Sequence, residues 1–280
     1  MISGKNGSGA TQSGQRVDDA GDLGHEGSSR AEASAFEVVS TVPCPVCGTP
    51  CQVIRFPVGR RQYSPVKVCP SCAKGHAEEA AALEQQRLND ALFEGSRLPR
   101  EARVLSILEG SGCGIEIDPG NVGVVNRLRR WVQGGCSSSL YLYGQPGTGK
   151  TLLTMAASMD AIRQGLSVIF LTEEHLINMA QLGRAQNDGR LERERAKQVR
   201  VLVIDDLGQF RINDAVVNEL FAILNARCPA WGPMRPVLVT GNLDPGQLSA
   251  RYSEAIASRL MGLCGGEYFQ LVGRDRRRKG

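Results

Sequence analysis

The segment that most constrains this 280-residue chain is residues 144–151, which reads G-Q-P-G-T-G-K-T. It follows an apolar, strand-like run and precedes a helix-like run that begins L-L-T-M-A-A. Glycines let several backbone N–H groups converge on a phosphate, lysine reaches the β- and γ-phosphates, and threonine offers a hydroxyl to Mg²⁺. The segment therefore predicts a nucleotide-binding loop, hereafter the P-loop. Its expected binding residues are Gly144, Gln145, Pro146, Gly147, Thr148, Gly149, Lys150 and Thr151.

A second motif lies 55 residues beyond Lys150, where V-L-V-I-D-D-L-G places two carboxylates after four apolar residues. Ligands of open α/β sheets bind at the carboxyl ends of strands, which is where these carboxylates are expected. Asp205 is predicted to coordinate Mg²⁺, mostly through water, because this hard cation prefers oxygen ligands. Asp206 is predicted to orient and deprotonate the attacking water. Paired aspartates can also end a strand simply as turn-forming residues.

Strand-like and helix-like runs alternate around these motifs, which favours a parallel sheet covered by helices. Strands are predicted over residues 140–143, 167–171, 200–204, 236–240 and 267–272. Helices are predicted over residues 122–133, 151–163, 173–182, 214–226 and 253–263, with a charged stretch reaching Gln198. The expected fold class is α/β, with a five-stranded parallel sheet and helices on both faces.

Nine cysteines occur in a chain whose first residues lack the apolar core of a secretion signal, which argues against a disulfide framework. Cys44 and Cys47 form one C-x-x-C pair, and Cys69 and Cys72 form another 21 residues later. This spacing is typical of a zinc ribbon, in which four thiolates complete a tetrahedron around a structural Zn²⁺. Cys51 and His76 remain as possible substitute ligands. A redox reading of either pair is weaker, because neither opens a helix after a strand.

Composition suggests four regions along the chain. Residues 1–36 are rich in Gly, Ser, Asp and Ala and are expected to be a disordered tail. Residues 37–75 are expected to form the zinc-ribbon module, residues 76–112 a connecting helix and linker, and residues 113–280 the nucleotide-binding domain. No stretch approaches the 18 apolar residues of a membrane span, so a cytoplasmic protein without membrane contact is expected.

The net charge of +4 does not by itself imply nucleic-acid binding, but five of the last seven residues are basic. This basic end spans residues 274–279. Such a run is either a solubilising tail or a contact for nucleic-acid phosphates.

Three further short motifs accompany the P-loop and the acidic strand: T-G-N at residues 240–242, S-R-L at 258–260 and G-R-D-R-R at 273–277. With these five motifs, residues 96–280 resemble the helicase-loader branch of the AAA+ ATPases, the DnaC and DnaI type. The transposition-helper ATPases of the IstB type share most of them.

The resemblance implies roles for three more residues. Asn242 would hold the lytic water, and Arg259 would act as an arginine finger that reaches the ATP of a neighbouring subunit. Arg277 would match a second sensor arginine, although the aromatic residue that precedes it in the family is replaced by Arg276. A ring or helical oligomer follows from a finger that acts in trans.

The resemblance also implies a function. The chain is expected to bind ATP, Mg²⁺ and Zn²⁺, to hydrolyse ATP, and to load a replicative DnaB-type helicase onto single-stranded DNA. The transposition helpers generally lack a zinc module, which favours the loader. Two alternatives stay open: a transposition helper that binds duplex DNA, and a non-enzymatic zinc-ribbon adaptor that binds DNA and nucleotide.

Overall fold

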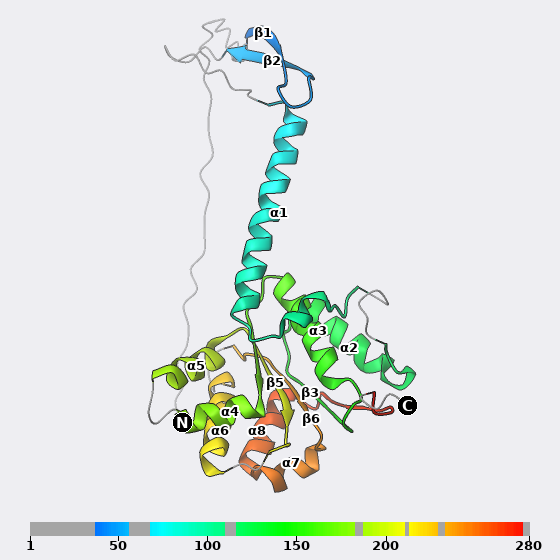
Figure 1. Ribbon diagram of the computed structural model, residues 1–280, viewed down its shortest axis with the longest axis vertical. Helices are drawn as coiled ribbons and strands as arrows, with labels where there is room; N and C mark the ends of the chain where they lie inside the picture. Colours follow the sequence, from blue (N-terminus) through cyan, green and yellow to red (C-terminus); the bar gives the residue numbers. More distant parts are fainter. Residues whose placement is uncertain are drawn as a thin grey trace, which may run out of the picture. The chain divides into compact units, whose positions relative to one another are not determined.

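The computed structural model describes residues 37–55, 68–109, 116–182, 187–210, 213–228 and 233–276. Contacts within the chain define two units, Met1–Gly75 and His76–Gly280, which are considered separately (Figure 1). The helices are α1 (Pro70–Glu94), α2 (Val122–Gln133), α3 (Lys150–Arg163), α4 (Glu173–Leu182), α5 (Asn187–Gln198), α6 (Asp214–Arg227), α7 (Pro245–Arg251) and α8 (Glu254–Cys264), with short 3-10 helices at Arg100–Val104 and Pro119–Asn121. The strands are β1 (Glu37–Pro43), β2 (Pro50–Arg55), β3 (Leu140–Gly144), β4 (Val168–Thr172), β5 (Val201–Leu207), β6 (Val237–Gly241) and β7 (Tyr268–Leu271).

The larger unit is built on a five-stranded sheet with the order β4-β5-β6-β3-β7. Every neighbouring pair is parallel, so all five carboxyl ends lie along one edge. β6 lies between β5, which carries the two aspartates, and β3, which leads into the P-loop. The order therefore brings the ends of three strands together at the site predicted to bind nucleotide, although they are far apart in sequence.

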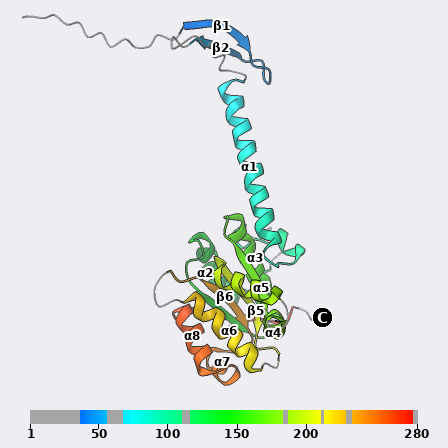
Figure 2. The same cartoon turned by 90° about the vertical axis from the view of Figure 1, so that its left-hand side faces the viewer.

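Helices cover both faces of this sheet because successive side chains of a strand point to opposite faces. Leu140 and Leu142 of β3 belong to a core shared with α2 and α3. Tyr141, between them, belongs to a second core shared with α4, α6, α7 and α8. Figures 1 and 2 show these two groups of helices on opposite sides of the sheet. The predicted α/β class and the five-stranded parallel sheet are confirmed.

Three elements differ from the prediction, and one of them is α7, which was not predicted. The strand expected to end at residue 204 continues to Leu207, so both aspartates lie within β5. The charged stretch before Gln198 forms the helix α5, which buries Ala196 against the second core. The sequence did not predict this helix because its mean hydropathy is low. An i,i+3 ion pair between Lys197 and Glu194 supports its last turn.

The smaller unit contains β1 and β2, which form an antiparallel hairpin. The turn between them carries the first C-x-x-C pair, and the second pair lies at the start of α1. Cys44, Cys51 and Cys69 form the centre of a small buried cluster. Its core is too small to stabilise a fold by burial alone, as expected of a unit held by a metal.

Among the residues that the structure describes, no helix has both the length and the apolar character needed to cross a lipid bilayer.

Candidate functional site

The P-loop joins β3 directly to α3, and its backbone requires glycine at several positions. Gly144, Gly147 and Gly149 have φ angles of 148°, 79° and 95°, which residues with a Cβ rarely adopt. A Cβ on Gly144 would lie 2.3 Å from the carbonyl oxygen of Leu271. The P-loop backbone therefore passes close to Leu271 of β7 and leads into the N-terminus of α3. Backbone N–H groups at a helix N-terminus are free to bind an anion.

Lys150 is the first residue of α3 and is only 4% exposed. Its Nζ donates hydrogen bonds to the carbonyl oxygens of Gly144 at 2.8 Å and Gln145 at 2.9 Å. The hydroxyl of Thr148 also donates to the carbonyl of Gln145, at 2.9 Å. These bonds hold the ammonium group over the loop that is predicted to receive the phosphates.

Asp205 is almost completely buried, at 2% exposure. Its Oδ1 accepts a hydrogen bond from the Thr240 hydroxyl of β6, at 2.5 Å. Burial raises the pKa of this carboxyl, and the hydrogen bond from Thr240 opposes that rise. Thr151 of α3 also lowers this pKa, so two oxygen ligands suited to Mg²⁺ lie near each other, one from β5 and one from α3.

Asp206 has a strained backbone, with a φ angle of 58°. Its register with β6 is interrupted, because Ile204 pairs with Val239 but Leu207 pairs with Gly241. Such a bulge redirects a side chain, and a non-glycine residue in this conformation costs about 1–3 kcal/mol. The N–H of Asp206 donates to the hydroxyl of Thr240 at 3.0 Å, which stabilises the bulge.

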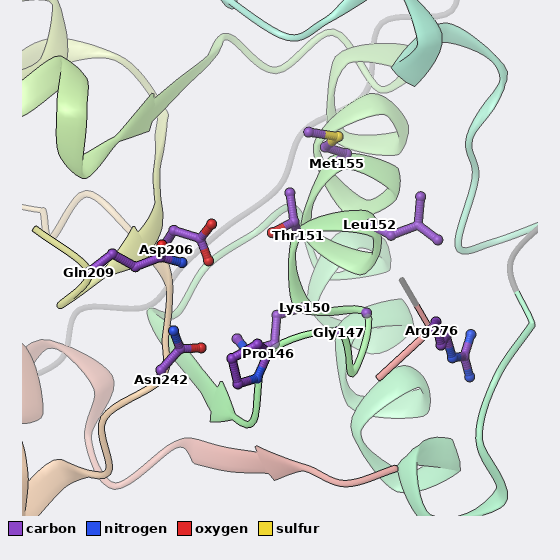
Figure 3. A pocket seen from close by; sticks show the side chains of 11 residues that line it. Pro146, Gly147, Lys150, Thr151, Leu152, Met155, Asp206, Gln209, Asn242 and Arg276 are labelled. Carbon is purple, nitrogen blue, oxygen red and sulfur yellow. The ribbon is translucent and has the colours of Figure 1, made fainter. Parts of the chain in front are cut away.

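These residues surround a cavity of about 290 Å³, hereafter the P-loop hollow. It is lined by Pro146, Gly147, Gly149, Lys150, Thr151, Leu152, Met155, Asp206, Gln209, Asn242 and Arg276. Figure 3 shows the Asp206 carboxylate directed toward Thr151, with Asn242 near the P-loop. The buried Oδ1 of Asn242 has no hydrogen-bond partner among the described residues, which suits a group that binds a ligand.

Most of the residues expected from the sequence meet here. Gly144, Gln145 and Asp205 lie directly behind the residues that line the hollow, since the first two accept hydrogen bonds from Lys150 and Asp205 adjoins Thr151. Thr148 lines a smaller cavity beside the hollow. The arrangement can bind a nucleotide phosphate chain, hold Mg²⁺ and place a carboxylate next to it.

Arg277 lies outside the described residues, but its neighbour Arg276 lines the P-loop hollow. The N–H of Arg276 donates to the carbonyl of Gly147 at 3.2 Å, and its guanidinium donates to the carbonyl of Glu116. The sequence motif did not predict Arg276, because this arginine stands where the family has an aromatic residue. The sequence feature that pointed to Arg276 was the basic run at residues 274–279.

Arg259 is not part of the P-loop hollow. It lies on α8 and lines a different cavity, of about 460 Å³, between α8 and α6. The other residues of that cavity are Phe221, Cys228, Ala255, Ser258 and Gly262. Within one chain, the described structure therefore separates Arg259 from the residues that line the P-loop hollow.

Thr240 is a further residue of the site that the sequence did not predict. It bridges the two aspartates, because its hydroxyl donates to Asp205 and accepts from the backbone of Asp206. The only sequence signal was its place in the T-G-N motif, two residues before Asn242.

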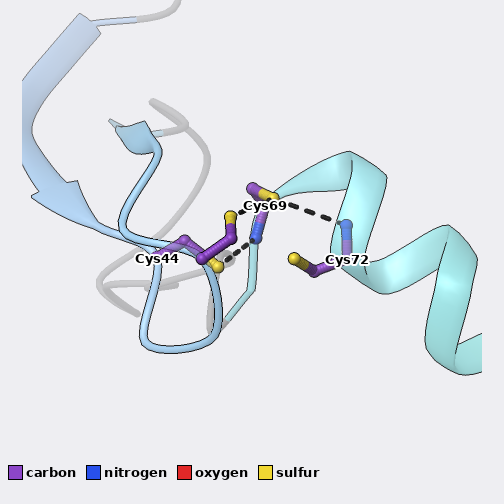
Figure 4. Close-up of side chains that lie close together, drawn as sticks. Cys44, Cys69 and Cys72 are labelled. Atoms are coloured by element: carbon purple, nitrogen blue, oxygen red, sulfur yellow. Dashed lines mark hydrogen bonds between the residues drawn. The ribbon is translucent and has the colours of Figure 1, made fainter.

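In the smaller unit, Cys44, Cys47, Cys69 and Cys72 place their sulfur atoms within 4.8 Å of one another. Around a tetrahedral zinc ion with Zn–S bonds of about 2.3 Å, sulfur atoms lie about 3.8 Å apart. The N–H of Cys69 donates to the sulfur of Cys44, and the N–H of Cys72 donates to the sulfur of Cys69, both at 3.4 Å (Figure 4). The first bond is the main cause that lowers the pKa of Cys44 to about 6, which favours a metal-binding thiolate.

The two substitute ligands stand apart from this set. Cys51 is buried beside it, but its thiol donates to the carbonyl of Thr49, and burial and the neighbouring thiols raise its pKa. The His76 side chain is 58% exposed and lies 3.8 Å from Glu79. Among the described residues, the four cysteines of the two pairs form the group that fits a metal ion.

Known proteins resemble the part of the chain that carries this site. A family model described as "IstB-like ATP binding protein" matches residues 125–261. A protein of insertion sequence IS5376 from Geobacillus stearothermophilus, named for ATP binding, is 29% identical over 125 residues, which are 44% of this chain and 47% of that protein. Its counterpart in IS21 of Pseudomonas aeruginosa is 36% identical over 93 residues, 32% of this chain and 34% of that protein. The chain thus spans less than half the length of either relative.

Two crystal structures share the fold. DnaI superposes with a TM-score of 0.51 and 24% identity, over 65% of this chain and 95% of that one. The DnaC helicase loader superposes with a TM-score of 0.51 and 17% identity, over 62% of this chain and 100% of that one. The predicted P-loop AAA+ fold is confirmed, and the family match supports ATP binding by this domain. Residues 125–261 therefore match the family model of the IstB-like ATP-binding proteins.

Proposed function

We propose that this protein binds ATP with Mg²⁺ and hydrolyses it. The observation that carries the proposal is the P-loop hollow, in which Lys150, Asp206 and Asn242 surround one cavity. The backbone N–H groups at the start of α3 bind the phosphates, and Lys150 exchanges its carbonyl partners for phosphate oxygens. Thr151 and Asp205 would hold Mg²⁺, which would neutralise charge on the phosphates.

Asp206 and Asn242 then act on water. Asn242 orients the water through its unpartnered Oδ1, and Asp206 accepts the proton as the water attacks the γ-phosphate. The bond from the γ-phosphorus to the bridging oxygen breaks in the same step, and ADP and phosphate leave. The bulge in β5 is the physical reason that Asp206, and not Asp205, projects into the hollow. Turnover of ATP by the purified protein, lost in Asp206→Asn, tests this and distinguishes an enzyme from a nucleotide-binding adaptor.

Arg259 acts in trans in this proposal. It is remote from the hollow of its own chain and lines a cavity on α6 and α8, so it completes the site only if the protein self-associates. The second sensor arginine is Arg277, with Arg276 as the arginine that lines the hollow.

The four cysteines Cys44, Cys47, Cys69 and Cys72 bind Zn²⁺ as a closed structural site in this proposal. Their mutual distances and the N–H bonds to two sulfur atoms support it. Zinc there stabilises the hairpin unit and leaves ATP chemistry to the larger unit.

For the biological role, the loader remains our proposal. The protein loads a DnaB-type replicative helicase onto single-stranded DNA, acts in the cytoplasm, and contacts the helicase through its amino-terminal unit. The fold shared with DnaI and DnaC and the four-cysteine unit support this role. The basic end offers charge for DNA phosphates.

A transposition helper is the second candidate, and the sequence relatives from insertion sequences favour it. Two assays with the full chain separate the candidates. ATP-dependent delivery of a DnaB-type helicase onto protein-coated single-stranded DNA supports the loader. Stimulation of a transposase on duplex DNA, without helicase delivery, supports the helper.

A further inference from the structure

A buried carboxylate outside the P-loop hollow has no role in the chemistry described above. Glu173 is the first residue of α4, follows β4 directly and has no exposed surface. Among the described residues, no basic side chain forms an ion pair with it. Burial of a carboxylate is costly unless hydrogen bonds compensate. Its hydrogen-bond partners therefore explain how it is retained.

Glu173 Oε2 accepts hydrogen bonds from two successive backbone N–H groups, Gln209 at 2.7 Å and Phe210 at 2.8 Å. These residues follow β5, so the carboxylate binds the segment that leads away from Asp205 and Asp206. Gln209 itself lines the P-loop hollow. The carboxylate therefore fixes one wall of the hollow from behind, through the backbone.

The other oxygen of Glu173 binds a different part of the fold. Its Oε1 accepts the hydroxyl of Tyr252 at 2.5 Å. Tyr252 caps the C-terminus of α7 and is separated from α8 by Ser253 alone. The neighbouring Arg251 also donates to the carbonyl of Phe210. The α7–α8 pair, which carries Arg259, is thus joined to the segment that lines the hollow.

We infer that Glu173 is a positioning residue: it holds residues 208–210 in the place that ATP hydrolysis requires and joins that segment to the α7–α8 pair through Tyr252. The inference rests on the proposed ATPase function. Glu173 does not line the hollow, so it acts through Asp206 and Gln209 and not on the nucleotide. A charged acceptor suits this task, because charge-assisted hydrogen bonds are about twice as strong as neutral ones.

Two variants test the inference. Glu173→Gln keeps the shape but replaces the charged acceptor with a neutral amide, and Tyr252→Phe removes only the bond to α7. Displacement of a catalytic group by about 1 Å can cost up to about 100-fold in rate. We expect kcat to fall at least about tenfold in both variants, while the Kd of a non-hydrolysable ATP analogue changes by less than about threefold because the P-loop is untouched.

Glu174→Gln is the matched control, since Glu174 lies on the same first turn of α4 but is exposed. It should leave both kcat and Kd unchanged. Thermal unfolding of each variant verifies that the protein is folded at the assay temperature. A folded Glu173→Gln or Tyr252→Phe variant with wild-type kcat would overturn the inference, because a purely structural contact changes stability alone.

Hydrogen exchange supplies a readout that does not need turnover. The amides of Gln209 and Phe210 should exchange faster in Glu173→Gln than in wild type or Glu174→Gln, because their acceptor is weaker. If wild-type protein binds nucleotide without hydrolysing it, the proposed ATPase function fails, and unchanged exchange of these two amides would then reject the positioning role as well. Faster exchange in that case would show that Glu173 stabilises this segment but would reject its role in ATP hydrolysis.

Discussion

Asp206 combines a strained backbone conformation with a side chain that lines the P-loop hollow. Its positive φ angle and the bulge that contains it are unfavourable by themselves, and the hydrogen bond from its N–H to Thr240 offsets part of that cost. The bulge separates the directions of the two adjacent carboxylates. Asp205 remains buried against Thr240, whereas Asp206 lines the P-loop hollow. Two chemically identical groups thereby receive different environments.

Asp206→Asn should bind ATP normally and lose hydrolysis by about 100- to 10,000-fold, because the variant lacks the general base. Asparagine tolerates a positive φ angle well, so the bulge should survive. Equilibrium binding of an ATP analogue and steady-state phosphate release measure the two effects. Hydrolysis at the wild-type rate would show that another group accepts the proton.

Lys150→Ala should instead weaken nucleotide binding by at least about 100-fold, since hydrogen bonds from a charged donor contribute about 1.5–3 kcal/mol each. Titration with a fluorescent nucleotide measures the change. Unaltered affinity in a folded variant would mean that the hollow is not the nucleotide site.

Arg276→Ala should raise the Kd for ATP by about tenfold, because one charged contact to the phosphates is lost. Arg274→Ala is the matched control, as Arg274 is exposed and does not line the hollow. Equal effects of the two substitutions on ATP affinity would argue against a specific role for Arg276.

At the scale of elements, the hairpin unit depends on groups that are brought together from two elements. The turn after β1 supplies two cysteines, and the start of α1 supplies the other two. The N–H groups of Cys69 and Cys72 complete the arrangement by binding sulfur. Zinc binding and folding of this unit should therefore be a single event.

Cys44→Ser should reduce the zinc content of the full-length protein from about one ion per chain to near zero and unfold the hairpin. Cys51→Ser is the control, because Cys51 is buried in the same cluster but lies outside the four-sulfur group. The Cys51→Ser protein should retain its zinc. Elemental mass spectrometry measures the metal. ATP turnover should persist in both variants, and zinc loss from the Cys51 variant would revise the ligand set.

At the scale of the whole molecule, catalysis is proposed to need more than one copy of the chain. Arg259 lines a cavity between α6 and α8, away from the P-loop hollow. An arginine that stabilises the transferring phosphoryl group must approach it closely. The separation is therefore compatible with a catalytic role only across an interface between subunits.

Arg259→Ala should preserve ATP affinity and slow turnover by up to about 1,000-fold. Mixing this variant with Lys150→Ala should restore part of the activity, because one subunit supplies an intact hollow and the other an intact arginine. Phosphate release across mixing ratios measures the rescue. Its absence at every ratio, with a monomeric ATP-bound protein by light scattering, would exclude the mechanism in trans.

The sequence by itself determined what depends on neighbouring residues. Glycine spacing predicted the P-loop, the apolar run before Asp205 predicted a buried strand, and alternating elements predicted the parallel sheet. These features are local, because phosphate-binding loops and strands are specified by residues close together in the chain.

Only the tertiary structure decided the features that depend on pairing between distant strands and helices. The bulge at Asp206 requires β6 beside β5, and the bridge from Thr240 arises from the same pairing. Arg276 reaches the P-loop because β7 pairs with β3. Glu173 joins three segments that lie up to 79 residues apart. Such contacts leave no periodic pattern in the sequence from which they could be predicted. They form because the free energy of the whole packed sheet, and not that of any one segment, determines which residues meet.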